Sequence, residues 1–147
     1  MEKNISGLLA SAKNAGVSVR PHMKTTKSPG LARILIEAGA AGICVAKLSE
    51  AEVMIEAGVD DVLITTEIVG EPKCTRLASL AGRTPNLRIV IDSEEAAIQI
   101  NEHMKKVSHP LLVLIDLNVG QNRCGVEDQD AALKLAQDRT TIADYPQ

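Results

Sequence analysis

Apolar side chains recur along this chain in two patterns that alternate from one end to the other. Six segments carry apolar residues three or four positions apart, which is the spacing of an amphipathic helix. Short segments between them read as strands. Residues 42–46 (Gly-Ile-Cys-Val-Ala) show no polar alternation, as is expected of a strand covered on both faces. The predicted helices are residues 2–15, 28–38, 49–57, 72–81, 93–107 and 128–138, and the predicted strands are residues 17–22, 42–46, 61–65, 87–91 and 111–117.

Local signals indicate where several of these helices begin and end. Ser28, which a proline follows, predicts a helix N-terminus, because serine caps free amides and proline suits the first turn. Ser49 and Glu52 have the spacing of a capping box for the next helix. The tetrapeptide Ile-Glu-Ala-Gly occurs at residues 36–39 and 55–58, so the same corner between a helix and a strand is predicted twice, with glycine ending each helix.

The alternation of helices and strands predicts an α/β fold with a parallel sheet and right-handed crossovers. No Gly/Ser linker or block of charge interrupts the chain of 147 residues, so we expect one domain. The sequence has no Phe or Trp and a single tyrosine, Tyr145, so its core must consist of Ile, Leu, Val, Ala and Met. Such a core suits helices packed on a parallel sheet.

Composition also argues against several functions. The lack of aromatic residues removes the stacking platforms of single-strand nucleic-acid binders, and a net charge of −3 disfavours polyanionic partners. Three scattered cysteines do not make a disulfide framework or a zinc site. The chain shows neither an apolar leader nor an apolar stretch of about 18 residues. We therefore expect a cytoplasmic protein that acts on a small molecule and has no nucleic-acid or membrane partner.

Polar residues follow each predicted strand, where binding groups gather in parallel α/β proteins. The loop after the last strand is both polar and rich in glycine, which packing alone does not explain. In chain order these residues are His22, Lys24, Thr25, Lys47, Ser49, Thr66, Glu67, Gly70, Asp92, Ser93, Asp116, Asn118, Gly120, Gln121, Asn122, Arg123 and Gly125.

Among these residues, Lys24 indicates a chemical function most clearly. It lies where the first predicted strand ends, beside His22 and Arg20, and such a lysine can form a Schiff base with an aldehyde cofactor. The alternative is a solvated lysine in a basic loop. Lys27, Lys47 and Glu67 are expected to be solvated or structural charges.

Three further residues near strand ends have plainer expected roles. Asp92 and Asp116 are expected to accept hydrogen bonds from backbone amides of the next turn rather than bind a metal, so no metal ligand is predicted. Cys124 is expected to be a small apolar filler, because nothing in the sequence indicates a lowered thiol pKa.

Four segments in order give the chain a family resemblance. They read Arg-Pro-His-Met-Lys-Thr-Thr-Lys at residues 20–27, Thr-Thr-Glu-Ile-Val-Gly-Glu-Pro-Lys at 65–73, Val-Ile-Asp-Ser at 90–93, and Ile-Asp-Leu-Asn-Val-Gly-Gln-Asn-Arg-Cys-Gly-Val at 115–126. Together they resemble the N-terminal part of the D-threonine aldolase and D-serine dehydratase-like family, which has the alanine racemase-type, fold type III, pyridoxal-phosphate barrel. The resemblance extends from residue 2 to about residue 136.

The resemblance implies roles for four residues. Lys24 matches the lysine that binds pyridoxal 5'-phosphate as a Schiff base, and Arg123 matches an arginine near the cofactor ring and its phenolic oxygen. His22 and Gln121 match polar positions at the same site. The predicted catalytic residues are thus Lys24 and His22, and the predicted cofactor-binding residues are Lys24, Arg123 and Gln121.

Two of these assignments have alternatives that the sequence leaves open. His22 can instead be a hydrogen-bonded histidine at a strand end. Arg123 can instead be a surface arginine that pairs with Glu127 or Asp128.

The chain also departs from the family pattern. The family usually has a second histidine where this sequence has Thr26. Members also begin with an extra strand and continue well past the point where this sequence ends, with later loops that bind the cofactor phosphate and a metal-binding C-terminal domain. The expected fold is therefore a partial (β/α)8 TIM-type barrel of about five parallel strands and six helices, in residues 1–138, with a polar tail in residues 139–147. Tyr145 lies in this tail and matches no catalytic position.

A partial barrel has open sheet edges and an exposed apolar face, so we expect a homo-oligomer that forms through them. The function expected from the sequence is that of a truncated pyridoxal-phosphate barrel protein that self-associates and binds the cofactor without being a complete enzyme. The alternative is an active lyase, aldolase or racemase for small D-amino acids, assembled by oligomerisation.

Overall fold

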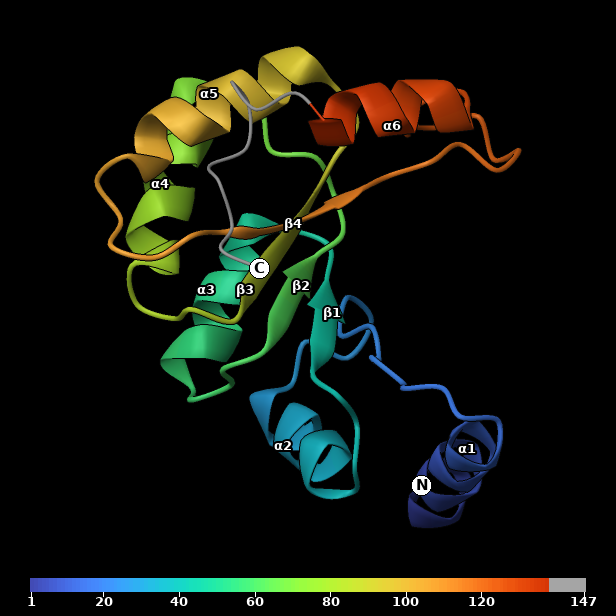
Figure 1. Cartoon of the computed structure of the whole chain (residues 1–147). Helices are drawn as coiled ribbons and strands as arrows, with labels where there is room; N and C mark the ends of the chain where they lie inside the picture. The colour runs from blue at the N-terminus through green and yellow to red at the C-terminus, as the bar shows by residue number, and fades with distance from the viewer. Residues whose placement is uncertain (138–147) are drawn as a thin grey trace.

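The computed structural model describes residues 1–137, which form an α/β fold around one parallel sheet (Figure 1). The four strands lie side by side in chain order, β1-β2-β3-β4. They are β1 (Ile43–Val45), β2 (Val62–Ile64), β3 (Leu87–Ile91) and β4 (Leu112–Ile115). Every neighbouring pair is parallel, so all four strands end at the same side of the sheet.

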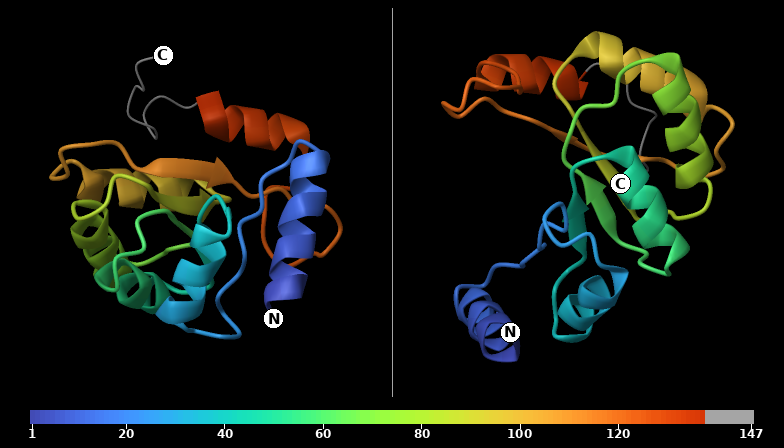
Figure 2. Two further views of the ribbon diagram at one scale, coloured as in Figure 1. Left: turned by 90° about the horizontal axis from the view of Figure 1, so that it is seen from below. Right: turned by 180° about the vertical axis from the view of Figure 1, so that it is seen from behind.

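After two consecutive helices at the N-terminus, helices alternate with the strands and lie mainly on one face of the sheet. Seen from below, α2 to α5 form an arc around the curved sheet, whereas α1 stands apart from it (Figure 2). No residue of α1 is buried. The helices are α1 (Glu2–Asn14), α2 (Pro29–Glu37), α3 (Leu48–Glu56), α4 (Glu71–Ala81), α5 (Glu94–Met104) and α6 (Gln129–Gln137).

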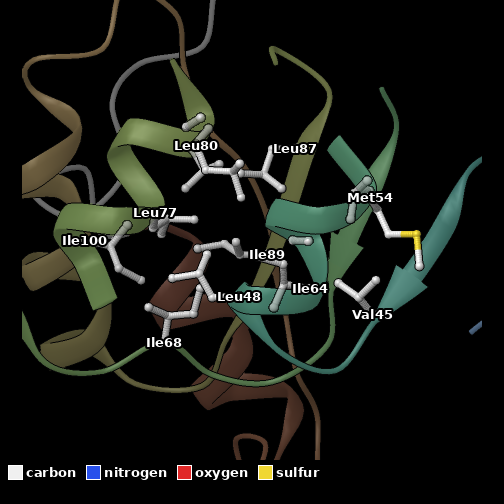
Figure 3. Packing of buried hydrophobic residues seen from close by; sticks show 14 of the residues in the cluster. Val45, Leu48, Met54, Ile64, Ile68, Leu77, Leu80, Leu87, Ile89 and Ile100 are labelled. Carbon is white, nitrogen blue, oxygen red and sulfur yellow. The ribbon is translucent and has the colours of Figure 1, made fainter. Parts of the chain in front are cut away.

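The core lies between the outer face of the sheet and the helices (Figure 3). Alternate residues of β1, β2 and β3 are buried because successive side chains of a strand point to opposite faces. Leu48 and Met54 of α3 and Leu77 of α4 cover the same face. As the composition predicted, the buried apolar side chains are Ile, Leu, Val, Ala and Met, to which the structure adds Cys74.

The opposite, inner face of the sheet is only partly covered in residues 1–137. Register puts Cys44, Leu63, Arg88 and Leu112 in one row across the four strands, with Leu114 two residues further along β4. Leu114 is 43% exposed, and no residue of β4 is buried. Apart from Arg88, both faces of these strands are apolar, but only the outer face is fully packed in the part described.

The prediction of a first strand at residues 17–22 is wrong. The segment runs beside β1, and Cys44 N–H donates to the Pro21 carbonyl at 2.8 Å, but only one isolated bridge forms, between His22 and Cys44. Pro21 has no N–H to donate, so a regular ladder cannot continue through it. The described part of the chain therefore has four strands rather than the predicted five.

The predicted helix N-termini are confirmed in part. The Ser28 hydroxyl accepts a hydrogen bond from Leu31 N–H, as expected of an N-cap. The predicted capping box of Ser49 and Glu52 is wrong, because α3 begins earlier, after Lys47, without a side-chain cap.

The repeated helix-to-strand corner is confirmed. Gly39 and Gly58 both have positive φ, and the residue after each donates its N–H to a carbonyl near the end of the preceding helix. The donors are Ala40 to Leu35 and Val59 to Met54, which is the Schellman pattern.

The remaining predictions concern the C-terminal tail and membrane-spanning segments. The polar tail of residues 139–147, with Tyr145, lies outside the residues that the structure describes. Among residues 1–137 no helix is long and apolar enough to span a bilayer.

Candidate functional site

The segment that carries Lys24 is attached to the sheet on both sides of this residue. Met23 is 2% exposed, and its N–H donates to the Cys44 carbonyl at 2.7 Å. Lys27 N–H donates to the Met23 carbonyl and closes a turn, and its amine lies 3.3 Å from a carboxylate oxygen of Glu50. The buried methionine and the ion pair thus hold the loop in which Lys24 stands.

Lys24 itself is exposed and projects from this loop. Its backbone N–H donates to Nδ1 of His22 at 3.2 Å, whereas its amine forms no hydrogen bond or ion pair with any residue in the range 1–137. The predicted reactive residue is therefore fixed by its backbone and leaves its amine available.

His22 is linked to the end of β2 through a residue that the sequence analysis did not select. Its Nε2 lies 3.0 Å from the hydroxyl oxygen of Thr65, and that hydroxyl donates to the Val45 carbonyl at 3.0 Å. Thr65 opens the second family segment, and its place at a strand end was the available signal. The structure thus brings His22, Lys24 and Thr65 together.

The environment of His22 favours its neutral form. Partial burial lowers the pKa of the imidazole from its usual value of 6.5, and the charge of Lys24 lowers it further. Glu50 acts in the opposite direction and raises it. Both ring nitrogens are within hydrogen-bond distance of a partner, which agrees with the alternative of a hydrogen-bonded histidine at a strand end.

The loop after β4 is a tight turn built around Asn118. Its side-chain oxygen accepts hydrogen bonds from the backbone N–H groups of Gly120 and Asn122, both at 3.1 Å. At Gly125, with φ of 96°, a Cβ atom would come within 2.6 Å of the Asn118 nitrogen. Glycine at position 125 is therefore required by the close packing of the loop on itself.

Gln121 and Arg123 are exposed on this loop. Arg123 forms no ion pair with Glu127 or Asp128, so the surface pairing considered for it is not observed among residues 1–137. Since Lys24 adjoins β1 and Arg123 follows β4, the two cations lie beyond opposite edges of the sheet, both at the end where the strands finish. No hydrogen bond within the described part joins them.

Asp92 accepts a backbone hydrogen bond, as predicted, but the donor is Gly125 N–H at 3.1 Å, in the loop after β4, rather than an amide of the next turn. Asp116 instead shares a cluster with Glu67 and Cys124, in which one donor atom of each residue lies within 4.8 Å of the others.

Cys124 has two carboxylates as neighbours and is therefore not a purely apolar filler, but its thiol pKa is not lowered, as expected from the sequence. Burial raises the pKa of its thiol to about 11, and Glu67 and Asp116 raise it as well. One oxygen of Glu67 is buried and has no hydrogen-bond partner, so Glu67 is not simply solvated. A metal ion would have to displace the thiol proton that this environment retains, and we assign none.

Comparison with known proteins agrees with the resemblance found in the sequence. A family model described as the alanine racemase N-terminal domain matches residues 1–143. The D-threonine aldolase of Arthrobacter sp is 37% identical over 136 residues, which are 92% of this chain and 36% of that protein. The D-threo-3-hydroxyaspartate dehydratase of Delftia sp. (strain HT23) is 33% identical over 140 residues, 95% of this chain and 37% of that protein.

A solved structure supports the same relationship. The crystal structure of D-threonine aldolase from Filomicrobium marinum superposes with a TM-score of 0.88 at 40% identity, over 91% of this chain and 36% of that one. The chain thus spans just over a third of the length of these relatives.

Proposed function

The chain belongs to the alanine racemase N-terminal domain family, whose model matches residues 1–143, and from this premise we propose that its Lys24 binds pyridoxal phosphate. The observation that carries the proposal is the placement of Lys24. Its amine has no partner among residues 1–137, while the adjoining backbone is held by Met23 and His22. A lysine that forms a covalent bond with an aldehyde needs this combination of a fixed position and an available amine nitrogen.

The other residues present also fit the cofactor. Arg123 is a cation without a partner in the described part of the chain, and it stands at the same end of the sheet as Lys24. A positive charge there would attract an anionic phosphate or phenolate group. When bound, pyridoxal phosphate supplies an electron sink for charge at the α-carbon of an amino acid.

The test is to add pyridoxal phosphate to the purified chain, reduce with borohydride, and locate the label by peptide mass spectrometry. We expect a yellow absorption band and labelling of Lys24 in the wild type, and loss of both in Lys24→Ala. Lys47→Ala is the matched control, because Lys47 is also exposed and follows the end of β1. Equal labelling of the wild type and Lys24→Ala, or no labelling at all, would refute the proposal.

For the whole protein we propose lyase chemistry on a small D-amino acid that carries a β-hydroxyl group. The relatives named D-threonine aldolase and D-threo-3-hydroxyaspartate dehydratase support this substrate class. Incubation of the cofactor-loaded protein with D-threonine and D-serine tests it, with L-threonine as the control. Cofactor binding without turnover would instead favour the function expected from the sequence, a cofactor-binding barrel protein that is not a complete enzyme.

We also propose that copies of the chain associate through the inner face of the sheet. Leu114, on the edge strand β4 of this face, is 43% exposed. Arg20 and Arg88 share Asp61 at the end where the strands begin, and Glu67 and Asp116 lie where they finish. A second copy packed in the antiparallel direction would bring these opposite charges together. Light scattering of the purified chain measures this association directly.

A further inference from the structure

We propose that His22 and Thr65 are positioning residues, which hold the backbone of Lys24 through a neutral imidazole with its proton on Nε2. The significance for cofactor binding rests on the proposed function of Lys24. The hydrogen-bond arrangement itself is independent of that function. It runs from Lys24 N–H to His22, from His22 to Thr65, and from Thr65 to the Val45 carbonyl.

The chemistry of the donors determines the tautomer. The Lys24 N–H can only donate, so Nδ1 of His22 must accept with a lone pair. The Thr65 hydroxyl has one proton, which it donates to the Val45 carbonyl, so its oxygen is left to accept from the other ring nitrogen. A neutral ring protonated at Nε2 meets both requirements, whereas the other tautomer meets neither.

Protonation of the ring would break this arrangement at Lys24. A second proton on Nδ1 would point at the Lys24 N–H, and two donors would then face each other. The charged groups around the ring are the amine of Lys24 in the same loop and Glu50 of α3, whose carboxylate also pairs with Lys27. Burial and Lys24 lower the pKa of His22 from 6.5, so the neutral ring persists at neutral pH.

This arrangement makes the position of Lys24 depend on pH. The lowered pKa means that the neutral ring, and the bonds through it, are complete above about pH 6.5. They are lost as the pH falls through the lowered value, because the folded state must then accept a proton at Nδ1. His22 is consequently assigned a positioning role rather than the acid–base role predicted for it.

The first test uses the chain without cofactor. Nitrogen-15 NMR of the ring should show an unprotonated Nδ1 and a protonated Nε2 in His22 at pH 7.5. In Thr65→Val, which keeps the shape and removes the hydroxyl, the ring should become a mixture of tautomers. Solvent exchange of the Lys24 amide should then accelerate by about fivefold, the effect of losing one neutral hydrogen bond. Thr65→Ser keeps the hydroxyl and should restore the wild-type values.

The second test measures borohydride labelling of Lys24 by pyridoxal phosphate as a function of pH. The wild type and Thr65→Ser should label about fivefold faster than Thr65→Val at pH 7.5, and the difference should shrink as His22 is protonated. Circular dichroism would verify that each variant is folded.

The outcomes separate the two proposals. A proton on Nδ1 in the wild type, or unchanged ring and amide signals in Thr65→Val, would overturn the positioning role whatever the cofactor does. Absence of labelling at Lys24, combined with the expected tautomer and amide behaviour, would instead reject the cofactor proposal and leave the positioning role intact.

Discussion

Cys124 illustrates how its neighbours determine the chemistry of one side chain. Its thiol lies with Glu67 and Asp116 where the strands end, and burial with these two carboxylates raises its pKa to about 11. The thiolate is the reactive form of cysteine, so this environment keeps the thiol unreactive at neutral pH. Glu67 follows β2, whereas Asp116 and Cys124 both follow β4, so the proximity of Glu67 to the other two residues depends on the parallel sheet.

Alkylation of Cys124 should therefore be slow. With the pKa at about 11, its thiolate fraction at pH 8.5 should be about a hundredfold below that of an ordinary cysteine. Peptide mass spectrometry after iodoacetamide treatment, with the urea-unfolded chain as the reference, measures the rate. Glu67→Gln removes one charge and should speed the reaction, whereas Glu127→Gln, outside the cluster, should not. Equal rates in the folded and unfolded chains would contradict this account.

At the scale of elements, Asp61 joins three segments of the fold. It precedes β2, and its carboxylate accepts hydrogen bonds from Arg20 of the segment before α2 and Arg88 of β3. The shortest distances are 2.7 Å, and all three side chains are largely shielded, with exposed fractions of 20% to 27%. Shielded, charge-assisted bonds contribute more to stability than exposed ones.

Replacement of Asp61 by asparagine should lower the free energy of unfolding by about 2 kcal/mol, because two arginines would lose their common counter-ion. Glu52→Gln is the matched control, since Glu52 makes an ion pair of similar length with Arg76 between α3 and α4, at the surface. Its expected cost is below about 1 kcal/mol. Urea unfolding followed by circular dichroism compares them, since the chain has no tryptophan. Equal losses of unfolding free energy would show that the Asp61 network stabilises the fold no more than the surface ion pair does.

At the scale of the whole molecule, the sheet is packed on one side only within residues 1–137. The helices cover its outer face, and the inner face presents apolar side chains that a complete barrel would enclose. Exposed apolar surface of this kind marks an interaction site. The proposed association of two copies follows from this one-sided packing.

Leu114→Lys should weaken that association at least tenfold, because it places a charge among the apolar side chains of the inner face. Ile98→Lys on α5 is the control, since Ile98 is also 43% exposed but lies on a helix outside the sheet. Size-exclusion chromatography with light scattering over a range of concentrations gives the molar mass of each. A wild-type chain that remains monomeric at micromolar concentration would reject the association.

Much of the fold was accessible from local pattern. The boundaries predicted for the strand at residues 87–91 match β3, and Ser28 and the two Ile-Glu-Ala-Gly corners behave as their local chemistry requires. Two errors have identifiable physical causes. The strand predicted at residues 17–22 fails at Pro21, which has no backbone N–H for the hydrogen bonds of a strand ladder. The predicted capping box fails because Glu52 pairs with the remote Arg76 rather than with its own helix end.

The sequence identified the segments that form the candidate site but not the contacts between them. The motif around Lys24 and its family resemblance come from consecutive residues and were visible in the sequence. The link from His22 to Thr65 spans 43 positions and exists because neighbouring parallel strands end together.

By itself, the sequence determined the six helices and the four strands of the described part, together with the residues that carry reactive groups, since these follow from side-chain spacing and chemistry. It also predicted a strand at residues 17–22 that does not form. Only the tertiary structure decided the tautomer of His22, the protonated thiol of Cys124 and the exposed inner face. Each of these depends on distances between segments that meet across the sheet, and hydrogen bonding, charge interaction and burial act through distance in space rather than along the chain.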